Sequence, residues 1–351
     1  MNVSPFYFKT VLLICLFLIF AFDSIGQSTA INQPLLPVKV GGKWGYINRL
    51  GRMIIKPRFV VAAEFQEGLA RVRDDCICFY FINQNGNPIS SDRFRFADDF
   101  SEGLAMVQGE NAEDKIGFID KTGKIIISPR FDSFSGKILW SFKDGLAIVV
   151  MNDKFGYIDK QGNFVIAPDF DSASPFSEGL AVVSKNGKYG FIDRKGRTRI
   201  DFLFATAFSF EDGFASFSLD RQKFGLIDTS GKVVLEPKFD WLSGFVEGLA
   251  SVNLGMAWYG HQKSGGKYGF IDKSGSLVIP IRYDVANSFS EGLAPVSIKG
   301  KWGFIDKTGE MKISPRFDWA EPFEDGISKV TLGEKIGYID KVGRYIWKPS
   351  E

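Results

Sequence analysis

The sequence predicts an all-β fold, namely a tandem array of nine three-stranded antiparallel β-meander repeats packed face to face. We expect a propeller-like open spiral, with a closed β-propeller as the alternative. Three observations support this prediction. A pattern of about 35 residues recurs along the chain, each copy alternates short apolar runs with turn residues, and the middle run is apolar on both of its faces.

Each copy is centred on a Lys-Trp-Gly-Phe-Ile-Asp motif, at its clearest in residues 301–306. A turn glycine closes this core in all nine copies, at Gly51, Gly86, Gly123, Gly162, Gly196, Gly231, Gly275, Gly309 and Gly343. An isoleucine precedes that glycine by four residues in every copy, at Ile47, Ile82, Ile119, Ile158, Ile192, Ile227, Ile271, Ile305 and Ile339. Between the cores lies a second signature, Glu/Asp-Gly-Leu-Ala, as in residues 67–70, 178–181 and 291–294.

The eighth copy shows how one repeat makes three strands. Residues 293–298 form a β-rich apolar run, residues 302–306 return antiparallel to it, and residues 311–314 make the third pass. The Asp306 side chain is expected to cap the second turn, and Gly309 to adopt the positive φ that this turn requires. Pro315 is expected to end the third strand because proline cannot donate to a β-ladder.

Side-chain alternation predicts how the small sheets pack. Trp302 and Phe304 share one face of the middle strand, while Gly303 and Ile305 share the other. Because both faces are apolar, neighbouring sheets should cover each other. We expect the recurring glycine at the Gly303 position to leave room for an aromatic ring of the adjacent sheet.

These cores, followed by glycine, Ile/Val, proline and Glu-Gly-Leu-Ala, resemble the WG-repeat family of bacterial exported repeat proteins. The resemblance extends from Leu35 to Pro349. It implies a repeat scaffold, frequently exported, without an assigned reaction. The second copy lacks the glycine of the motif and reads Cys-Phe-Tyr-Phe-Ile-Asn, and the fifth has Phe202 where proline is expected. We expect these two copies to pack differently.

The ends of the array favour a spiral over a ring. Residues 35–38 match residues 293–296, so the first copy begins with its own first strand, and the ninth copy completes its third strand at Trp347. No strand is left over to be exchanged between the ends.

The N-terminus predicts export. Lys9 precedes an apolar run over residues 11–22, which is too short for a membrane-spanning helix but typical of a signal peptide. We expect a signal peptide at residues 1–26 with cleavage before Gln27, a short leader at 27–34 and one repeat domain at 35–351. An uncleaved anchor is the alternative. The predicted location is the periplasm, the cell surface or the medium.

Composition narrows the function. The chain has 43 Lys+Arg, 41 Asp+Glu and a single histidine, for a formal net charge of +2. Near-neutral charge argues against nucleic-acid binding, and one histidine argues against Ser/His/Asp triads and histidine-ligated metals. We predict no enzyme activity, no catalytic residue, no metal and no cofactor.

Candidate binding residues lie where the period breaks. In the seventh copy Leu249 and Gly269 are 20 residues apart, whereas Leu293 and Gly303 are 10 apart. The extra residues carry Trp258, Tyr259 and His261, and we interpret them as a long binding loop. The alternative is an insertion that merely packs on the neighbouring sheet.

Three further tryptophans are candidates. Trp140 lies where the connector of the third copy gains five residues. Trp241 and Trp319 occupy equivalent connector positions, where exposed indoles could stack on sugar rings, although core packing is the favoured interpretation.

The repeated carboxylates are interpreted as turn residues, because catalysis needs an acid once and a scaffold needs a cap in every repeat. A carboxylate precedes Gly-Leu-Ala, or its variants, eight times, and cation binding is the alternative. Four other aspartates do not belong to this repeated pattern, namely Asp74, Asp75, Asp98 and Asp99. If their side chains met in one pocket, they would favour an enzyme. Cys76 and Cys78 are two residues apart and are expected to be a structural or incidental pair, with redox and metal roles as the alternatives.

The leading hypothesis is therefore an exported, non-enzymatic scaffold that binds a protein or a glycan at the cell envelope or outside the cell. A carboxylate-dependent hydrolase on a propeller-like frame and a mechanical spacer or adhesin stalk are the alternatives. The sequence leaves the partner's identity and the oligomeric state open.

Overall fold

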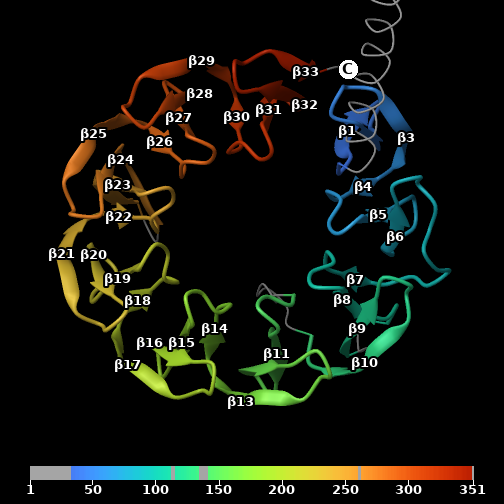
Figure 1. Cartoon of the computed structure of the whole chain (residues 1–351), viewed down its shortest axis with the longest axis horizontal. Coiled ribbons are helices and arrows are strands. Elements are labelled where there is room, and N and C mark those ends of the chain that lie inside the picture. The colour runs from blue at the N-terminus through green and yellow to red at the C-terminus, as the bar shows by residue number, and fades with distance from the viewer. Residues whose placement is uncertain (1–32, 112–114, 134–140, 260–261, 350–351) are drawn as a thin grey trace, which may run out of the picture.

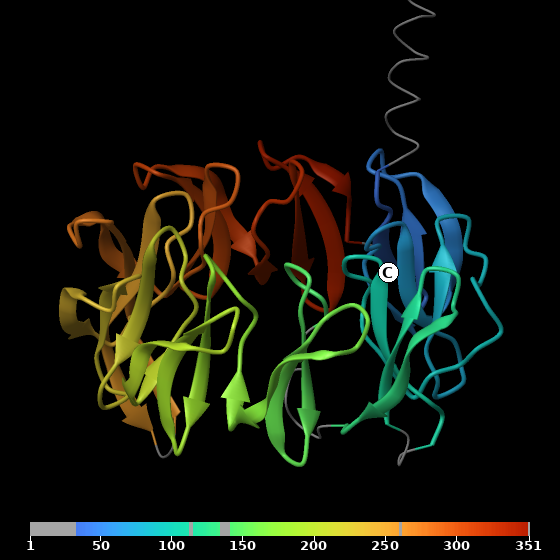
Figure 2. The same cartoon turned by 60° about the horizontal axis from the view of Figure 1, so that its bottom comes forward.

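The computed structural model describes residues 33–111, 115–133, 141–259 and 262–349. These residues form 33 β-strands and no helix, so none of the described segments is a helix that could span a membrane. The strands make nine small sheets, which stand side by side around a central axis like the blades of a propeller (Figures 1 and 2). The predicted all-β, propeller-like array of nine repeats is confirmed.

The strands fall into four classes from the centre outward, and blades 1 to 9 follow chain order (Figure 1). The innermost strands have two residues: β4 (Val61–Ala62), β7 (Phe96–Ala97), β14 (Ser172–Ala173), β18 (Thr206–Ala207), β22 (Trp241–Leu242), β26 (Val285–Ala286) and β30 (Trp319–Ala320). The second strands are β1 (Leu36–Val40), β5 (Leu69–Arg73), β8 (Leu104–Gln108), β11 (Ala147–Met151), β15 (Leu180–Lys185), β19 (Phe214–Ser218), β23 (Leu249–Tyr259), β27 (Leu293–Ile298) and β31 (Ile327–Leu332).

The third strands carry the Lys-Trp-Gly motif: β2 (Lys43–Ile47), β6 (Tyr80–Asn83), β9 (Ile116–Asp120), β12 (Lys154–Ile158), β16 (Lys188–Asp193), β20 (Phe224–Asp228), β24 (Gln262–Asp272), β28 (Lys301–Asp306) and β32 (Lys335–Asp340). The outermost strands are β3 (Met53–Phe59), β10 (Ile125–Phe131), β13 (Phe164–Phe170), β17 (Thr198–Phe204), β21 (Val233–Phe239), β25 (Leu277–Tyr283), β29 (Met311–Phe317) and β33 (Tyr345–Trp347).

The prediction of three strands per repeat was incomplete. Six of the nine sheets have four strands, and three have three. The additional strand is the innermost one, and in five of these six sheets it starts within two residues of the end of the preceding blade's outermost strand, as Trp319 follows Phe317. The connector thus crosses directly from the rim of one blade to the centre of the next. Two residues are too few to show a periodic pattern, which is why the sequence did not reveal this strand.

The turn after the third strand forms as predicted. Gly309 has a φ of 83°, and its N–H donates to Asp306 O at 2.9 Å. The Asp306 carboxylate accepts the N–H groups of Thr308 and Glu310 at 2.9 and 3.1 Å. The local sequence therefore fixes this turn by itself.

The outermost strand contains two corrections. Pro315 does not end the strand but lies within β29, where the register to β28 shifts. Beyond β29 the sheet has no further strand that would need the missing N–H of this proline. The glycine of the motif does not make room for a neighbouring aromatic ring. A Cβ on Gly156 would lie 2.7 Å from Ile166 O and 2.8 Å from Pro168 N, so glycine is required because the bulged outer strand of the same blade passes over it.

The core lies between the blades, as the two apolar faces of the middle strand predicted. In β28 both Phe304 and Ile305 are fully buried, one on each face of the sheet. A phenylalanine just before each Glu/Asp-Gly turn fills each of the eight junctions from blades 1 and 2 to blades 8 and 9 and is at most 3% exposed: Phe65, Phe100, Phe142, Phe176, Phe210, Phe245, Phe289 and Phe323. In seven junctions its ring centroid lies 4.8 to 5.2 Å from an aromatic ring of the preceding blade's third strand.

The Glu/Asp-Gly turns form a second repeated contact, which we call the carboxylate clamp. Each is a two-residue hairpin turn in which both residues have positive φ, as at Glu291 (53°) and Gly292 (82°). In six junctions the carboxylate accepts the N–H of the next blade's turn glycine at 2.9 to 3.3 Å. In five of these junctions it also pairs with a lysine of the next blade's Asp-Lys turn at 2.8 to 3.4 Å. The repeated carboxylates are thus turn residues, as predicted, that also join neighbouring blades.

The first and last blades contact each other. Arg49 of blade 1 donates to the backbone oxygen of Asp325 at 2.7 Å and to its carboxylate at 2.8 Å, which repeats the carboxylate clamp between blades 9 and 1. The Tyr338 hydroxyl of β32 donates to Pro37 O of β1 at 2.8 Å. Val38 and Ile47 are buried against Tyr338. These contacts join the two ends of the described array.

Of the two blades expected to deviate, only blade 2 does. Its sheet β4–β5–β6 has no outermost strand, and residues 84–95 make only two isolated bridges, Phe79 to Phe94 and Ile82 to Pro88. In blade 5, β17 has the ordinary seven residues, and Phe202 packs against the apolar core of its neighbour.

Candidate functional site

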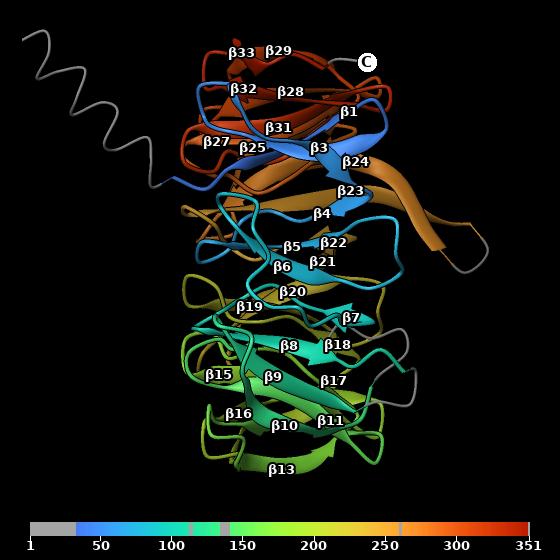
Figure 3. The same cartoon turned by 90° about the vertical axis from the view of Figure 1, so that its right-hand side faces the viewer.

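The period break of blade 7 is an extended β-hairpin, not the long loop that the sequence suggested. β23 and β24 have 11 residues each, and their pairing continues from Leu249↔Asp272 to Tyr259↔Gln262. Figure 3 shows this hairpin projecting beyond the other blades on one side of the ring. We call this side, which carries the hairpins between second and third strands, the hairpin face, and the opposite side the clamp face.

A connector aspartate supports the hairpins of several blades. In five blades the lysine that begins the Lys-Trp-Gly motif pairs with an aspartate 17 residues later: Lys115–Asp132, Lys154–Asp171, Lys223–Asp240, Lys267–Asp284 and Lys301–Asp318. The second carboxylate oxygen accepts a backbone N–H from the hairpin of the next blade. Each aspartate therefore joins two blades on the hairpin face.

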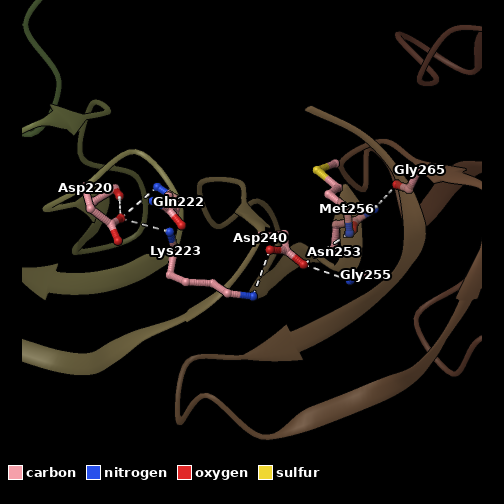
Figure 4. A network of polar contacts seen from close by, with 9 residues as sticks. Asp220, Gln222, Lys223, Asp240, Asn253, Gly255, Met256 and Gly265 are labelled. Carbon is pink, nitrogen blue, oxygen red and sulfur yellow. Dashed lines mark hydrogen bonds and ion pairs between the residues drawn. The ribbon is translucent and has the colours of Figure 1, made fainter. Parts of the chain in front are cut away.

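Asp240 is the most buried member of this series. Its side chain is 7% exposed, against 29 to 40% for the other four aspartates. Lys223 Nζ lies 2.8 Å from Asp240 Oδ1, and Gly255 N and Met256 N donate to Oδ2 at 2.8 and 3.2 Å (Figure 4). A buried carboxylate with a cation and two backbone donors holds the base of the extension.

The network of polar contacts around Asp240 extends to Asp220 and to Asn253. The Asp220 carboxylate accepts the N–H of Gln222 at 2.7 Å and of Lys223 at 3.2 Å (Figure 4), and these backbone hydrogen bonds lower the pKa of Asp220 below its ordinary value. On the hairpin, Asn253 Nδ2 donates to Gly265 O at 3.3 Å.

Three glycines allow the hairpin backbone to leave the regular strand conformation above Asp240. Gly255, Gly265 and Gly266 have φ values of 88°, 84° and 71°, which side chains rarely tolerate. The extension is therefore anchored at its base and changes direction at a glycine pivot. Leu254, on the base side of these glycines, and Ala257, beyond them, are exposed, and Met256 is half-buried.

The predicted binding residues are placed as follows. The backbones of Trp258 and Tyr259 form the end of β23, whereas His261 and Trp140 lie outside the described residues. The Trp241 ring is half-buried, with its centroid 5.4 Å from that of Phe208. Trp319 is 45% exposed, and its ring packs 4.7 Å from Trp302. Trp241 is the register partner of Asn253 at the base of the hairpin, whereas Trp319 lies in blade 9 and pairs with Thr331 of β31.

The four aspartates that could have indicated an enzyme have separate partners. Asp74 accepts from the Cys76 thiol at 2.9 Å, and Asp75 pairs with Lys43. Asp98 accepts from Ser141 Oγ at 2.8 Å, and Asp99 lies 3.3 Å from Arg71. Neither described cavity is lined by any of them.

Other chemistry is sparse in the part of the chain that the structure describes. Cys76 and Cys78 are free thiols, and the hydrogen bond to Asp74 raises the pKa of Cys76. No cluster of three or more histidine, cysteine, aspartate or glutamate side chains is arranged to hold a metal among these residues. The connector aspartates were missed from the sequence, although their constant spacing of 17 residues from lysine would have identified them.

Nine stacked blades joined by repeated clamps define a β-propeller-like repeat protein. The family model for the WG containing repeat matches the chain eight times, and the chain therefore belongs to this family. The matches cover residues 44–75, 81–111, 116–155, 155–189, 189–221, 224–255, 268–302 and 302–335.

Similar solved structures include "The crystal structure of BamB from Moraxella catarrhalis", with 10% identity and a TM-score of 0.44, covering 78% of this chain and 92% of that one. Another is "KlHsv2 with loop 6CD replaced by a Gly-Ser linker", with 12% identity and a TM-score of 0.40, covering 78% of this chain and 89% of that one. No curated protein matches the sequence.

Proposed function

We propose that the protein is an exported, non-enzymatic scaffold and that a partner protein binds the blade 7 hairpin on the hairpin face. The observation that carries this proposal is a ribbon of two 11-residue strands whose outer part projects beyond the other blades and is anchored at its base by the buried carboxylate of Asp240. A ring held by repeated clamps supplies a rigid base for such a projection.

The edges of the ribbon favour a protein as partner. On one side β22 pairs with β23 only as far as Asn253, and on the other β25 pairs with β24 only as far as Tyr268. Beyond these residues both edges of the two-stranded ribbon lack a neighbouring strand among the described residues. A lone two-stranded ribbon is marginally stable in water, and unpaired backbone groups are suited to accept a strand from another chain.

Shortening the hairpin tests this proposal. Residues 255–266 are replaced by Asn-Gly, so that Leu254 and Lys267 are closed by the same turn that joins Lys185 to Lys188 in blade 5. We expect the variant to keep its circular dichroism spectrum and to lose retention of the native partner in a pull-down from the producing cells. Retention equal to that of the unaltered chain would overturn the proposal.

Glycan binding is the second candidate, because Trp319 exposes nearly half of its indole surface beside Trp302. A glycan array with the mature chain and Trp319→Ala separates the two candidates. Binding that depends on Trp319 and not on the blade 7 hairpin would favour the glycan.

Export is proposed from the apolar run at residues 11–22. Intact-mass measurement of the protein purified from its natural host tests it. The expected mass is that of a chain beginning at Gln27, and a mass that includes residues 1–26 would contradict cleavage.

We also propose that the nine blades form a closed ring without strand exchange. Support comes from the Arg49–Asp325 pair, which repeats the carboxylate clamp at the junction of blades 9 and 1. Spin labels on cysteines at Lys39 and Lys335, in a chain with Cys76 and Cys78 replaced by serine, should give one narrow distance distribution. A broad distribution would favour a spiral.

A further inference from the structure

The junction of blades 2 and 3 differs from the other junctions at its outer end. In seven junctions an aliphatic residue of the outermost strand packs on the turn glycine of the next blade: Ile55, Ile127, Ile166, Ile200, Leu235, Ile279 and Ile313. A Cβ on that glycine would lie 2.9 to 3.3 Å from a carbon of this side chain. The aliphatic side chain therefore closes the outer end of each of these junctions.

Blade 2 has a serine at this position. The residue two positions after the one that pairs with the motif isoleucine is Ile55 in blade 1 and Ser90 in blade 2. Ser90 lies against Gly123, the turn glycine of blade 3, where a Cβ would be 2.9 Å from the Ser90 Cβ. Serine has one oxygen beyond Cβ where isoleucine has three carbons, so this junction lacks apolar volume that the other seven have.

A cavity of about 640 Å³ lies at this junction, and clefts of about 300 to 1,000 Å³ are typical of small-molecule sites. Its lining is mixed. The apolar part comes from Phe94, Ile119 and Ile125. The charged part comes from Asp92, Arg93, Glu110 and Lys124.

The four charged side chains differ in whether they already have partners. Arg93 Nη1 donates to Ser91 O and Asp92 O at 3.1 Å, and the guanidinium lies 4.2 Å from the ring centroid of Tyr80. Within the described part of the chain, the side chains of Asp92, Glu110 and Lys124 form no ion pair or hydrogen bond. One cation and two carboxylates are thus available to a ligand that carries both signs of charge.

We propose that this cavity, which we call the rim site, binds a short peptide that has free termini and an aliphatic side chain. The aliphatic side chain takes the place of the missing isoleucine beside Phe94 and Ile119. The terminal carboxylate pairs with Lys124, and the terminal ammonium pairs with Asp92 or Glu110. An uncharged aliphatic molecule would leave these charges unpaired, and a simple ion would leave the apolar wall uncovered. The rim site does not depend on the blade 7 hairpin.

Isothermal titration calorimetry of the purified protein with the peptide Ala-Leu-Ala tests the proposal. Ser90→Ile restores the side chain of the other seven junctions, so it should weaken binding at least about tenfold without lowering the melting temperature. The peptide Ala-Ala-Ala lacks the group that fills the cavity and should also bind at least about tenfold more weakly. Equal affinity of the unaltered protein and Ser90→Ile would overturn the proposal, as would no measurable binding of Ala-Leu-Ala at about 1 mM.

Two further variants test the charged groups. Lys124→Gln should weaken binding of Ala-Leu-Ala about fivefold and leave binding of the same peptide with an amidated C-terminus unchanged. Ile55→Ser makes the corresponding gap between blades 1 and 2, where Asn87 stands in place of Lys124, and should not add a second binding site. An unchanged affinity in Lys124→Gln would contradict the pairing with the carboxylate. A second site in Ile55→Ser would contradict recognition by charge.

Discussion

The carboxylate clamp gives the most direct quantitative prediction. Glu291 accepts the N–H of Gly326 at 3.0 Å and pairs with Lys341 at 2.8 Å. A hydrogen bond to a charged group contributes about 1.5 to 3 kcal/mol. Because the Glu291 side chain is 28% exposed and Lys341 is 43% exposed, we reduce this to about 1 to 2 kcal/mol. The substitution Glu291→Ala removes both contacts and keeps the unfavourable positive φ.

The assay is hydrogen exchange at the Gly326 amide. A loss of about 1 to 2 kcal/mol corresponds to exchange roughly 5 to 30 times faster. Glu310→Ala is the matched control, because Glu310 pairs with Lys312 on the surface and is 68% exposed, and its effect should stay below about 0.5 kcal/mol.

Comparison with Glu178→Ala separates the two contacts of Glu291. Glu178 accepts from Gly213 at 3.0 Å, but Thr229 stands where the other clamps have a cation. The difference between the two alanine variants should therefore be about 0.2 to 1 kcal/mol, the contribution of Lys341. Unchanged exchange of Gly326 in Glu291→Ala would refute the clamp as a stabilising contact.

Three further predictions follow from the same geometry. Hydrogen bonds from Lys341 lower the pKa of Glu291 below its ordinary value, and those from Arg197 lower the pKa of Asp193 to about 2. These two carboxylates contribute their full stabilisation above their unfolded pKa values near about 4, and the contribution is lost as the pH falls through the folded values. A melting temperature that stays constant from pH 7 to pH 3 would contradict this prediction. Gly156→Ala should lower the free energy of unfolding in urea by at least about 2 kcal/mol because of the close approach of Ile166 O. Gly187→Ala, in open space at a φ of 74°, should lower it by about 1 kcal/mol. Equal losses would show that the close approach does not matter. Asp240→Asn should speed cleavage of the blade 7 hairpin in limited proteolysis, because it removes the charge that pairs with Lys223. Asp284→Asn is the control and should not create a cleavage site, because the blade 8 hairpin is short and closes with the pair Ile298↔Lys301. Identical digestion patterns would count against Asp240 as the anchor.

The sequence revealed the parts of the fold that are local and repeated. The Asp306 to Gly309 turn and the two apolar faces of β28 follow from residue chemistry within one copy, and both were confirmed. The innermost strands were missed because a two-residue strand such as Trp319–Ala320 is defined by its partner β31 and has no period of its own.

The candidate site was only partly predictable for a similar reason. Excess length in the seventh copy located it, but the extra residues were interpreted as a loop. They include Gly255, Gly265 and Gly266, and glycine is depleted in strands. Pairing across the hairpin overrides that preference. The role of Asp240 depends on contacts with two neighbouring blades, which no pattern within a single copy can show.

The two faces of the ring differ in how freely their turns can vary. On the clamp face the Glu/Asp-Gly turns have two residues, and in six of them the carboxylate reaches the next turn glycine, a contact that an inserted residue would break. On the hairpin face the aspartate contacts only the first backbone N–H groups beyond the second strand, so the connection above them is free to lengthen. Asn186–Gly187 and the whole extension over residues 255–266 meet the same requirement at Asp171 and Asp240. A longer connection on the hairpin face, such as the blade 7 extension, therefore leaves the contact between neighbouring blades intact.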